Sequence, residues 1–521
     1  ITLAYMAVAT TLLIVQWSLD SFQPVLFVLA LLSKERSPLM PDLPTAEESG
    51  LPGFDVHDAR YERTEEWLTV LHRLLTEDTV THSGALYDLQ GCVMEPKPSA
   101  LPTAELAQEY GTPFFLYHGE MISERVRRVR ETLETEVSYS VKANPSLGVC
   151  QLIASEREAG AEVASSGELA VALAAGFEPE DIVFAGPGKT DDELRRAVIE
   201  GIFAVNVESV HEIDRLARIV RESGKSIGVG LRINPEAQLM GSGMRMGGTV
   251  GQFGMDQAEL GEAVQKTLSH RELALRGVHV YTATQVFEVG PLLEHCRNIL
   301  EISLEAADLA GRPLEMIDFG GGFGVPYFEK MSEFDLDGFA GGFRELLSSY
   351  RQDPRLEGCR YLFELGRYLV ADAGVYVTKV VDVKETRGKT FVVTDGGMNH
   401  HLTATGNMGQ VFRKAYPLLN LTRMGGVPEE SVAVAGPCCT PLDMFGNNIL
   451  LVTPEAGDLI GVFYSGAYGY SASNLGFLSH PTPAEVLLWR EGAHLLRPGG
   501  RPEDVLSGQR ALSKPESGVP G

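Results

Sequence analysis

The sequence predicts an α/β protein in which a (β/α)8 barrel is combined with a β-rich domain. Between residues 116 and 372, eight short apolar runs with β character alternate with longer helical patterns, as in a barrel of parallel strands. After residue 372 the β-rich runs continue without helices between them, which indicates a second, mainly β domain. A doubly wound sheet is the rival arrangement, but it usually has fewer strands.

The individual elements follow from these runs. The expected barrel strands are 137–143, 161–165, 182–187, 203–209, 227–235, 275–282, 315–322 and 361–367. Helices are expected at 168–176, 191–201 and 210–224, the last of which ends in Gly224, a common helix stop. The β-rich runs are 374–385, 389–397, 431–437, 448–454 and 458–466. The predicted domains are therefore a barrel over 116–372 and a β-domain formed by 81–115 and 373–492, of sandwich or barrel type.

Both ends of the chain lie outside these domains. Residues 1–80 contain two apolar runs, Ile1–Ser18 and Pro24–Leu32, then a linker and a helical pattern at 59–76. No basic region precedes the first run, so a secretory signal is poorly supported. A membrane anchor stays open as an alternative to a leader without functional weight. The last stretch, 493–521, is rich in Gly, Pro, Ser and Arg and is expected to be a disordered tail.

Composition limits the classes of partner. The chain has 70 acidic and 44 basic side chains and a formal net charge of −26, which argues against nucleic acid as a partner and favours a small-molecule substrate. The six cysteines are sparse and none has CxxC spacing. They are expected to be reduced thiols in a cytoplasmic protein, and no metal site is expected.

Chemical groups stand at the carboxyl ends of the predicted barrel strands, where barrel enzymes place their active sites. Lys142 ends the first strand, His279 lies on the sixth, and three glycines (Gly320–Gly322) follow the seventh. Glu364 and Arg367 end the eighth. Each signal alone is more often structural than functional. Together they supply what pyridoxal 5′-phosphate (PLP) needs: an amine for the aldehyde, backbone N–H groups for the phosphate, a ring against the pyridine and an acid for its nitrogen.

This ordered set resembles the fold-type III PLP decarboxylases, the group that includes diaminopimelate and ornithine decarboxylases, over residues 84–492. The resemblance implies an alanine racemase-like fold, with Lys142 as the Schiff-base lysine, His279 stacked on the cofactor ring and Glu364 paired with the pyridinium. It implies that the phosphate is surrounded by Thr282, Gly320, Gly321, Gly322, Arg367 and Tyr468.

The loop from Gly436 to Cys439 matches a family loop that delivers a cysteine to the partner subunit of a dimer. The resemblance implies a homodimer with shared active sites, in which Cys439 returns a proton to the substrate Cα. Asp443 follows on the same loop, and Asp395 matches an acidic position near the active site in some members.

The sequence departs from the family where the substrate side chain is held. Thr440 stands where members acting on diamines or diaminopimelate carry an acid, and no arginine is found near Thr403, where a distal carboxylate would need it. His400 and His401 are expected to line the substrate entrance rather than to bind a metal. The substrate is therefore expected to have an acidic or neutral side chain.

Three stretches, 282–285, 398–401 and 477–480, resemble a subgroup associated with natural-product and exopolysaccharide (exosortase-type) gene clusters. Some of its members decarboxylate amino acids tethered to an acyl carrier protein. The alternatives are a diaminopimelate decarboxylase, a racemase on the alanine racemase plan, and a non-enzymatic PLP-binding protein, although such small proteins lack the β-domain and the cysteine loop.

Overall fold

The computed structural model describes residues 80–83, 88–92, 101–156, 159–236, 244–245, 251–328, 331–407, 414–424, 426–428, 430–490 and 492–512. The chain divides into two compact units, Ile1–Leu101 and Pro102–Gly521. In the first unit, β1 (Val80–Ser83) pairs antiparallel with β2 (Asp88–Cys92). The apolar runs, linker and helix predicted before residue 80 lie outside the described residues. Within the described part of the chain, no helix combines the length and the apolar character needed to cross a membrane.

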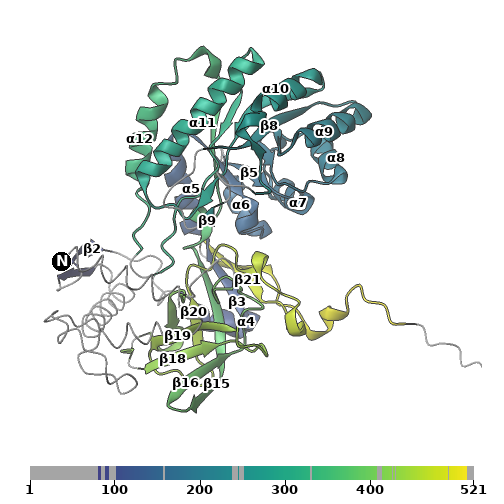
Figure 1. Ribbon diagram of the computed structural model, residues 1–521. Coiled ribbons are helices and arrows are strands. Elements are labelled where there is room, and N and C mark those ends of the chain that lie inside the picture. Colours follow the sequence, from purple (N-terminus) through teal and green to yellow (C-terminus); the bar gives the residue numbers. More distant parts are fainter. Residues whose placement is uncertain are drawn as a thin grey trace, which may run out of the picture. The chain divides into compact units, whose positions relative to one another are not determined.

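Within the second unit, a closed ring of parallel strands forms the centre of the helix-covered barrel (Figure 1). The ring strands are β4 (Glu136–Ser140), β5 (Ala159–Val163), β6 (Ile182–Phe184), β7 (Ala204–Val207), β8 (Ile227–Asn234), β11 (Leu273–His279), β13 (Met316–Asp318) and β14 (Arg360–Leu365). They pair in this order, and β14 pairs with β4 to close the ring. The predicted eight-stranded barrel is confirmed. Its strands read as apolar runs because they are buried on both faces.

Helices cover the outside of the ring (Figure 1). They are α5 (Gly119–Leu133), α6 (Leu147–Ser155), α7 (Ser166–Ala175), α8 (Asp191–Glu200), α9 (Val210–Ser223), α10 (Leu260–Ser269), α11 (Val289–Ala310), α12 (Leu336–Ser348) and the short α13 (Arg367–Val370). Their ends are set by local chemistry. A capping box between Thr190 and Glu193 begins α8, and Gly224 in the left-handed conformation ends α9.

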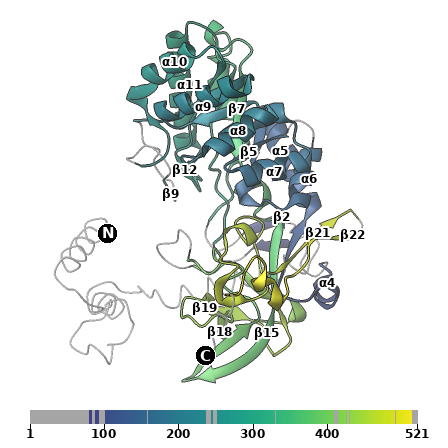
Figure 2. The same cartoon turned by 90° about the vertical axis from the view of Figure 1, so that its right-hand side faces the viewer.

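The β-domain is organised around the long strand β15 (Gly374–Thr386). Its first half pairs with β3 (Phe114–His118) and β20 (Leu459–Val462), and its second half pairs with β16 (Lys389–Thr394). The other strands are β17 (Leu418–Asn420), β18 (Glu430–Ala435), β19 (Met444–Leu451), β21 (Ala484–Trp489) and β22 (Gly492–Arg497) (Figure 2). β15 therefore links β3 and β20, which pair with its first half, to β16, which pairs with its second half.

Smaller elements complete the description: helix α4 (Thr103–Tyr110) and the two-residue strands β9 (Met244–Arg245), β10 (Met255–Asp256) and β12 (Ala283–Thr284).

Two predicted boundaries need correction. Within 81–115, β3 is the strand that joins the β-domain, whereas β1 and β2 pair with each other. The disordered tail was also placed too early, because β22 runs to Arg497 and a 3-10 turn spans Pro502–Leu506. The sequence GAHLLR forms a strand because it pairs with β21 across a tight turn at Arg490, which has a positive φ of 57°.

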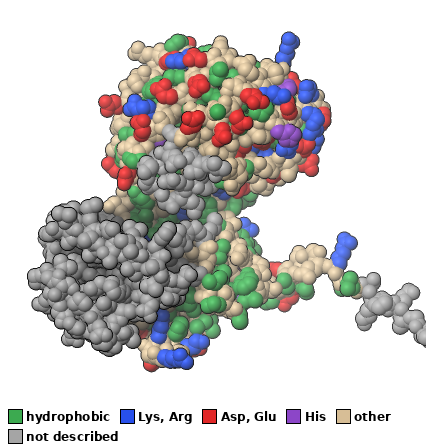
Figure 3. Space-filling model, in the orientation of Figure 1, with side chains coloured by type: hydrophobic (Ala, Val, Ile, Leu, Met, Phe, Trp, Pro, Cys, Tyr) green, Lys and Arg blue, Asp and Glu red, His purple; other side chains and the backbone are tan. Residues whose placement is uncertain are grey.

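Charge is unevenly spread over the barrel face seen in Figure 3. Acidic side chains occur across it, and basic ones gather towards the side of α8 and α9. There Arg195, Arg215 and Arg218 are ion-paired with carboxylates on the same helices. These arginines therefore mainly neutralise their acidic neighbours.

Candidate active site

Lys142 lies in a 3-10 turn that directly follows β4. A segment of the β-domain holds this turn from the other side. The backbone N–H of Tyr468 donates to the carbonyl of Ala143 at 2.7 Å, and the Asn144 side chain donates to the carbonyl of Gly466 at 3.0 Å. The barrel and the β-domain therefore meet at the lysine that the sequence singled out.

The amine of Lys142 is paired with a carboxylate that sequence reasoning missed. Its Nζ atom donates to Glu162 Oε1 at 3.0 Å and to Oε2 at 2.7 Å. Glu162 is on β5 and is 1% exposed. Burial alone would lower the pKa of Lys142, but the charge of Glu162 outweighs it and raises that pKa above its ordinary value. The available signal was a carboxylate inside the predicted strand 161–165, where an apolar side chain is the rule.

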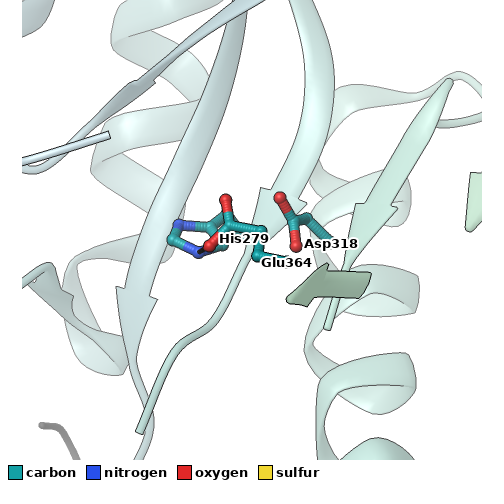
Figure 4. Close-up of side chains that lie close together, drawn as sticks. All are labelled: His279, Asp318 and Glu364. Carbon is teal, nitrogen blue, oxygen red and sulfur yellow. Dashed lines mark hydrogen bonds and ion pairs between the residues drawn. The ribbon is translucent and has the colours of Figure 1, made fainter. Parts of the chain in front are cut away.

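Three more buried side chains converge inside the barrel (Figure 4). His279 ends β11 and Asp318 ends β13, and the two residues are direct partners in the parallel pairing. Glu364 lies two residues beyond Leu362, the partner of Asp318 on β14. Side chains at these positions face the same way. The Nε2 atom of His279 lies 3.1 Å from Glu364 Oε2.

The two carboxyl groups of this trio titrate in opposite directions. Burial raises the pKa of Asp318 well above its ordinary value, and the nearby charge of Glu364 adds to this. Burial would also raise the pKa of Glu364, but His279 and then Lys142 lower it to about 2. The surroundings therefore favour the ionised form of Glu364 and the protonated form of Asp318.

Arg367 begins α13 and has no carboxylate partner among the described residues. It donates to the hydroxyl of Tyr327 at 3.1 Å, and its guanidinium lies 4.6 Å from the ring centre of Tyr468. Its Nε atom is buried without a hydrogen-bond partner. Burial would lower the pKa of Arg367, but Tyr327 and Tyr468 outweigh it, and the group stays cationic. A buried cation of this kind suits an anionic ligand.

The glycine loop after β13 has room for no side chain. Gly320 and Gly322 have φ of 61° and 106°, which favours glycine. A Cβ on Gly321 would lie 2.0 Å from the carbonyl oxygen of Glu364. The loop therefore brings its backbone against the end of β14.

Lys142, Glu162, His279, Glu364, Arg367 and Tyr468 line one cavity of about 510 Å³, whereas Asp318, Gly320, Gly321 and Gly322 are not among its lining residues. Its charged and hydroxyl-bearing lining side chains are Lys142, Glu162, Arg232, His279, Tyr281, Thr284, Tyr327, Glu364, Arg367, Thr403, Tyr416 and Tyr468. Arg232, on β8, was also missed by sequence reasoning. It is held by Glu208 at 2.6 Å, and Glu208 also accepts from the backbone N–H groups of Gly186 and Gly254.

Thr282 is not among the lining residues, contrary to its predicted place at the phosphate. Its hydroxyl group lies 3.1 Å from Nε2 of His295 on α11. Both side chains are buried, so this hydrogen bond satisfies a polar pair behind the cavity wall.

His400 and His401 are not among the residues that line the Lys142 cavity. His401 is fully buried in the β-domain, with Ser465 2.9 Å from Nε2 and Thr403 3.1 Å from Nδ1. His400 is held by Tyr376 and by the carbonyl of Pro481, and it borders a separate cavity of about 430 Å³. Burial lowers the pKa of His400 to about 4 and that of His401 to about 3. Both are neutral residues of the β-domain interior.

Asp395 also lies away from the Lys142 cavity. Its carboxylate accepts from the hydroxyls of Thr112 and Thr378 and from the backbone of Lys379, at 2.5, 2.7 and 2.9 Å. It therefore joins β15 to the loop before β3. An acidic residue in a motif-like turn was read as substrate-facing, but it stabilises the turn itself.

The cysteine loop is shaped by Asp443, which is 2% exposed. Its two oxygens accept from the backbone N–H groups of Met398 at 2.6 Å and Cys438 at 2.7 Å. Asp443 thus faces the loop rather than the cavity. Cys439 is exposed, and neither it nor Thr440 is among the residues that line the cavity of its own chain.

Among the described residues, one group of three has ligand atoms close enough to hold a metal ion. It is His279, Asp318 and Glu364, with one atom of each lying within 4.8 Å of the others. No metal was predicted from the sequence, and all three belong to the site described above.

The chain matches known proteins over most of its length. Residues 120–371 match the family model described as "Pyridoxal-dependent decarboxylase, pyridoxal binding domain". The L-glutamyl-[BtrI acyl-carrier protein] decarboxylase of Niallia circulans is 37% identical over 412 residues, which is 78% of this chain and 95% of that protein. The diaminopimelate decarboxylase of Zymomonas mobilis is 31% identical, over 79% of this chain and 96% of that protein.

Solved structures agree. The diaminopimelate decarboxylase of M. jannaschii with L-lysine matches with a TM-score of 0.72 at 26% identity, covering 84% of this chain and 99% of that one. The Helicobacter pylori enzyme with L-lysine matches with a TM-score of 0.70 at 28% identity, over 78% of this chain and 98% of that one. The predicted family, cofactor and enzyme class are confirmed: the chain belongs to the pyridoxal-dependent decarboxylases, which remove a carboxyl group from an amino acid with PLP as cofactor.

Proposed function

We propose that this enzyme decarboxylates an amino acid with an acidic or neutral side chain, free or carried as a thioester on an acyl carrier protein. One observation carries the proposal most directly. In the Lys142 cavity, both lining carboxylates, Glu162 and Glu364, already have partners among the chain's own side chains, so neither is free to pair with a basic substrate side chain.

The residues present fit PLP. Lys142 offers the amine for the aldehyde. The ionised Glu364 suits a protonated pyridine nitrogen, since its Oε1 atom is buried without a hydrogen-bond partner. Arg367, with its unpartnered Nε, the glycine loop and Tyr468 suit the phosphate. When bound, PLP draws electrons from the substrate Cα as carbon dioxide leaves.

The chain's own groups then have distinct tasks. Glu364 supplies the negative charge that keeps the pyridine nitrogen protonated. Glu162 lies within hydrogen-bond distance of Lys142 Nζ and can take up or return its proton. The aromatic wall formed by Tyr281, Tyr327 and Tyr416 excludes water from the reacting atoms.

The substrate class follows from charge. A basic side chain brought into a buried pocket needs a carboxylate partner, because an unpaired buried ammonium costs several kcal/mol. Among the described lining residues, neither carboxylate is left without a partner. Thr440 on the cysteine loop offers a hydroxyl group in place of an acid. A neutral side chain does not meet this cost, and an acidic side chain avoids it when its charge is removed.

A carrier-bound substrate is supported by the relative from Niallia circulans, whose name states that it acts on an L-glutamyl acyl-carrier protein. A thioester removes the negative charge of the carboxylate that it replaces, so a tethered glutamyl group reaches the cavity without a second free carboxylate. This form also needs no arginine near Thr403.

Cys439 belongs to the same proposal. Cys439 is exposed on its own chain. In a dimer, it would enter the Lys142 cavity of the other subunit and donate the proton to the substrate Cα. The functional unit is then a homodimer with two shared sites.

The test is a comparison of carbon dioxide release by the holoenzyme from two substrate sets. One set contains lysine, ornithine and meso-diaminopimelate. The other contains aspartate, glutamate, neutral amino acids, and aspartyl and glutamyl thioesters of an acyl carrier protein. We expect the highest kcat/KM in the second set. A pocket built for a charged group discriminates by about 10⁴ against substrates that lack the group, and a pocket without a partner for that group should discriminate against substrates that carry it.

The Lys142→Ala variant is the matched control for release without the cofactor-binding lysine. A kcat/KM for meso-diaminopimelate above that for every member of the second set would establish the diaminopimelate decarboxylase alternative. Conversion of an L-amino acid to its D-form without carbon dioxide release would establish the racemase alternative.

A further inference from the structure

Asp318 is a buried acid to which the proposed mechanism gives no task. It is fully buried at the end of β13. It lies beside His279, its register partner on β11, and beside Glu364, which stands two residues beyond its register partner Leu362 on β14. Figure 4 shows Glu364 between the ring of His279 and the carboxyl group of Asp318.

The two carboxyl groups are close and incompletely hydrogen-bonded. One oxygen of each lies within 4.8 Å of the other. Asp318 Oδ1 accepts from the backbone N–H of Gly320 at 2.9 Å, and Glu364 Oε2 meets His279 at 3.1 Å. The remaining oxygens, Asp318 Oδ2 and Glu364 Oε1, are buried without a partner. Two buried carboxylates this close cannot both ionise without strong repulsion.

We propose that Asp318 is a positioning residue: it is held as a neutral acid whose proton faces Glu364, so that Glu364 alone carries the negative charge towards the cofactor. This inference rests on the proposed function, in which Glu364 faces the pyridine nitrogen.

The surroundings decide which carboxyl group keeps the proton. Glu364 faces His279 on β11 and Lys142 beyond β4, both of which favour its ionised form. Asp318 is faced by two carboxylates, Glu364 on β14 and Glu162 on β5, and its one hydrogen-bond donor is the backbone of Gly320. The proton therefore stays on Asp318, where Oδ2 can donate it to its ionised neighbour.

This arrangement gives Asp318 a specific effect on the cofactor. A neutral donor behind Glu364 fixes the orientation of that carboxylate without adding a second negative charge. An ionised Asp318 would instead repel Glu364 and raise its proton affinity, which would weaken its hold on the pyridinium.

Three variants of the full-length holoenzyme test the proposal: Asp318→Asn, Asp318→Leu and Glu364→Gln. Asparagine copies the neutral acid, because its amide can donate to Glu364 and its oxygen can accept from Gly320. Leucine is similar in size but does neither. The first readout is the dissociation constant for PLP, measured by equilibrium dialysis together with the visible absorption spectrum. The second is the pH dependence of urea unfolding at a fixed, saturating PLP concentration.

We expect Asp318→Asn to bind PLP within about twofold of the unsubstituted protein, and Asp318→Leu and Glu364→Gln to bind at least about tenfold more weakly. Folding of the leucine variant is checked by circular dichroism. Between pH 5 and 8, the unfolding equilibrium constant of the unsubstituted protein should increase with pH more steeply than that of Asp318→Asn, by an additional factor of about ten per pH unit. The reason is that the folded unsubstituted protein keeps one proton on Asp318, which the unfolded chain releases.

Equal pH slopes for the unsubstituted protein and Asp318→Asn would overturn the proposal, and so would a loss of PLP affinity in Asp318→Asn as large as in Glu364→Gln. Normal PLP binding by Glu364→Gln would instead refute the role proposed for Glu364. In that case the pH slopes would still report where the proton lies.

Discussion

The Nζ atom of Lys142 lies 2.7 Å and 3.0 Å from the two carboxylate oxygens of Glu162. Lys142 directly follows the first strand of the barrel, and Glu162 lies on the second strand and is almost completely buried. The pair favours the ammonium form of Lys142, whereas attack on an aldehyde requires the neutral amine. Glu162 is therefore well placed to control when Lys142 can react.

Glu162→Gln should make Lys142 reactive at lower pH. Without the carboxylate, the pKa of Lys142 falls, and the fraction of neutral amine at a given pH rises. We expect the pH midpoint for attachment of PLP to the apoenzyme to move down by about one unit or more. The measurement is the absorbance of the cofactor–lysine adduct as a function of pH. Glu178→Gln, on an exposed loop of the same barrel, is the matched control. An unchanged or higher midpoint in Glu162→Gln would contradict this role.

Arg367→Met should weaken binding of PLP but not of pyridoxal, which lacks the phosphate. A charge-assisted hydrogen bond contributes about 1.5–3 kcal/mol, so we expect the PLP dissociation constant to rise about ten- to a hundredfold. The measurement is fluorescence quenching of the apoenzyme by each compound. Arg367→Lys keeps the positive charge, so its dissociation constant for PLP should lie between those of the unsubstituted protein and Arg367→Met. Equal losses of affinity for PLP and pyridoxal would show that Arg367 does not hold the phosphate.

Asp443→Asn should destabilise the cysteine loop. The asparagine side chain has one accepting oxygen, and its nitrogen can only donate. One of the two backbone N–H groups, of Met398 or of Cys438, therefore loses its acceptor. We expect the free energy of unfolding in urea to fall by about 1.5–3 kcal/mol. Asp382→Asn, at an exposed position of β15 in the same domain, should change it by less than about 0.5 kcal/mol. A loss no greater than in this control would mean that the loop does not depend on Asp443.

Mixing Lys142→Ala with Cys439→Ala should restore activity that neither variant has alone. In a shared-site dimer, random exchange makes half of the dimers hybrid, and one of the two sites in each hybrid has both side chains intact. About a quarter of the sites should then be active. Carbon dioxide release after subunit exchange, verified by native mass spectrometry, measures this. Complete exchange without recovery would place Cys439 outside the partner's site.

Much of the fold could be predicted because barrel strands are buried on both sides and read as short apolar runs. Lys142, His279, Glu364 and Arg367 could be found because each is polar or charged at or near the end of such a run. Glu162 and Arg232 are charged residues inside predicted strands, so a search of the strand ends alone does not find them.

The errors have a shared physical cause. Asp395 and His401 are polar residues in loops, and the sequence alone does not show whether such a residue faces a ligand or satisfies its own backbone. In this chain, both form hydrogen bonds within the β-domain. Thr282 illustrates the same limit within the barrel, since its hydroxyl group is turned to His295.

The central claim, that Lys142 is the residue that bears the cofactor in this cavity, can be tested by one experiment. The holoenzyme is treated with borohydride, digested and analysed by mass spectrometry for the peptide that carries the reduced cofactor. The account predicts that the label lies on Lys142, and that Lys142→Ala carries none. Stoichiometric labelling of another lysine in the unsubstituted protein would contradict the account, because the roles of Glu162, Glu364 and Arg367 are all derived from the position of Lys142.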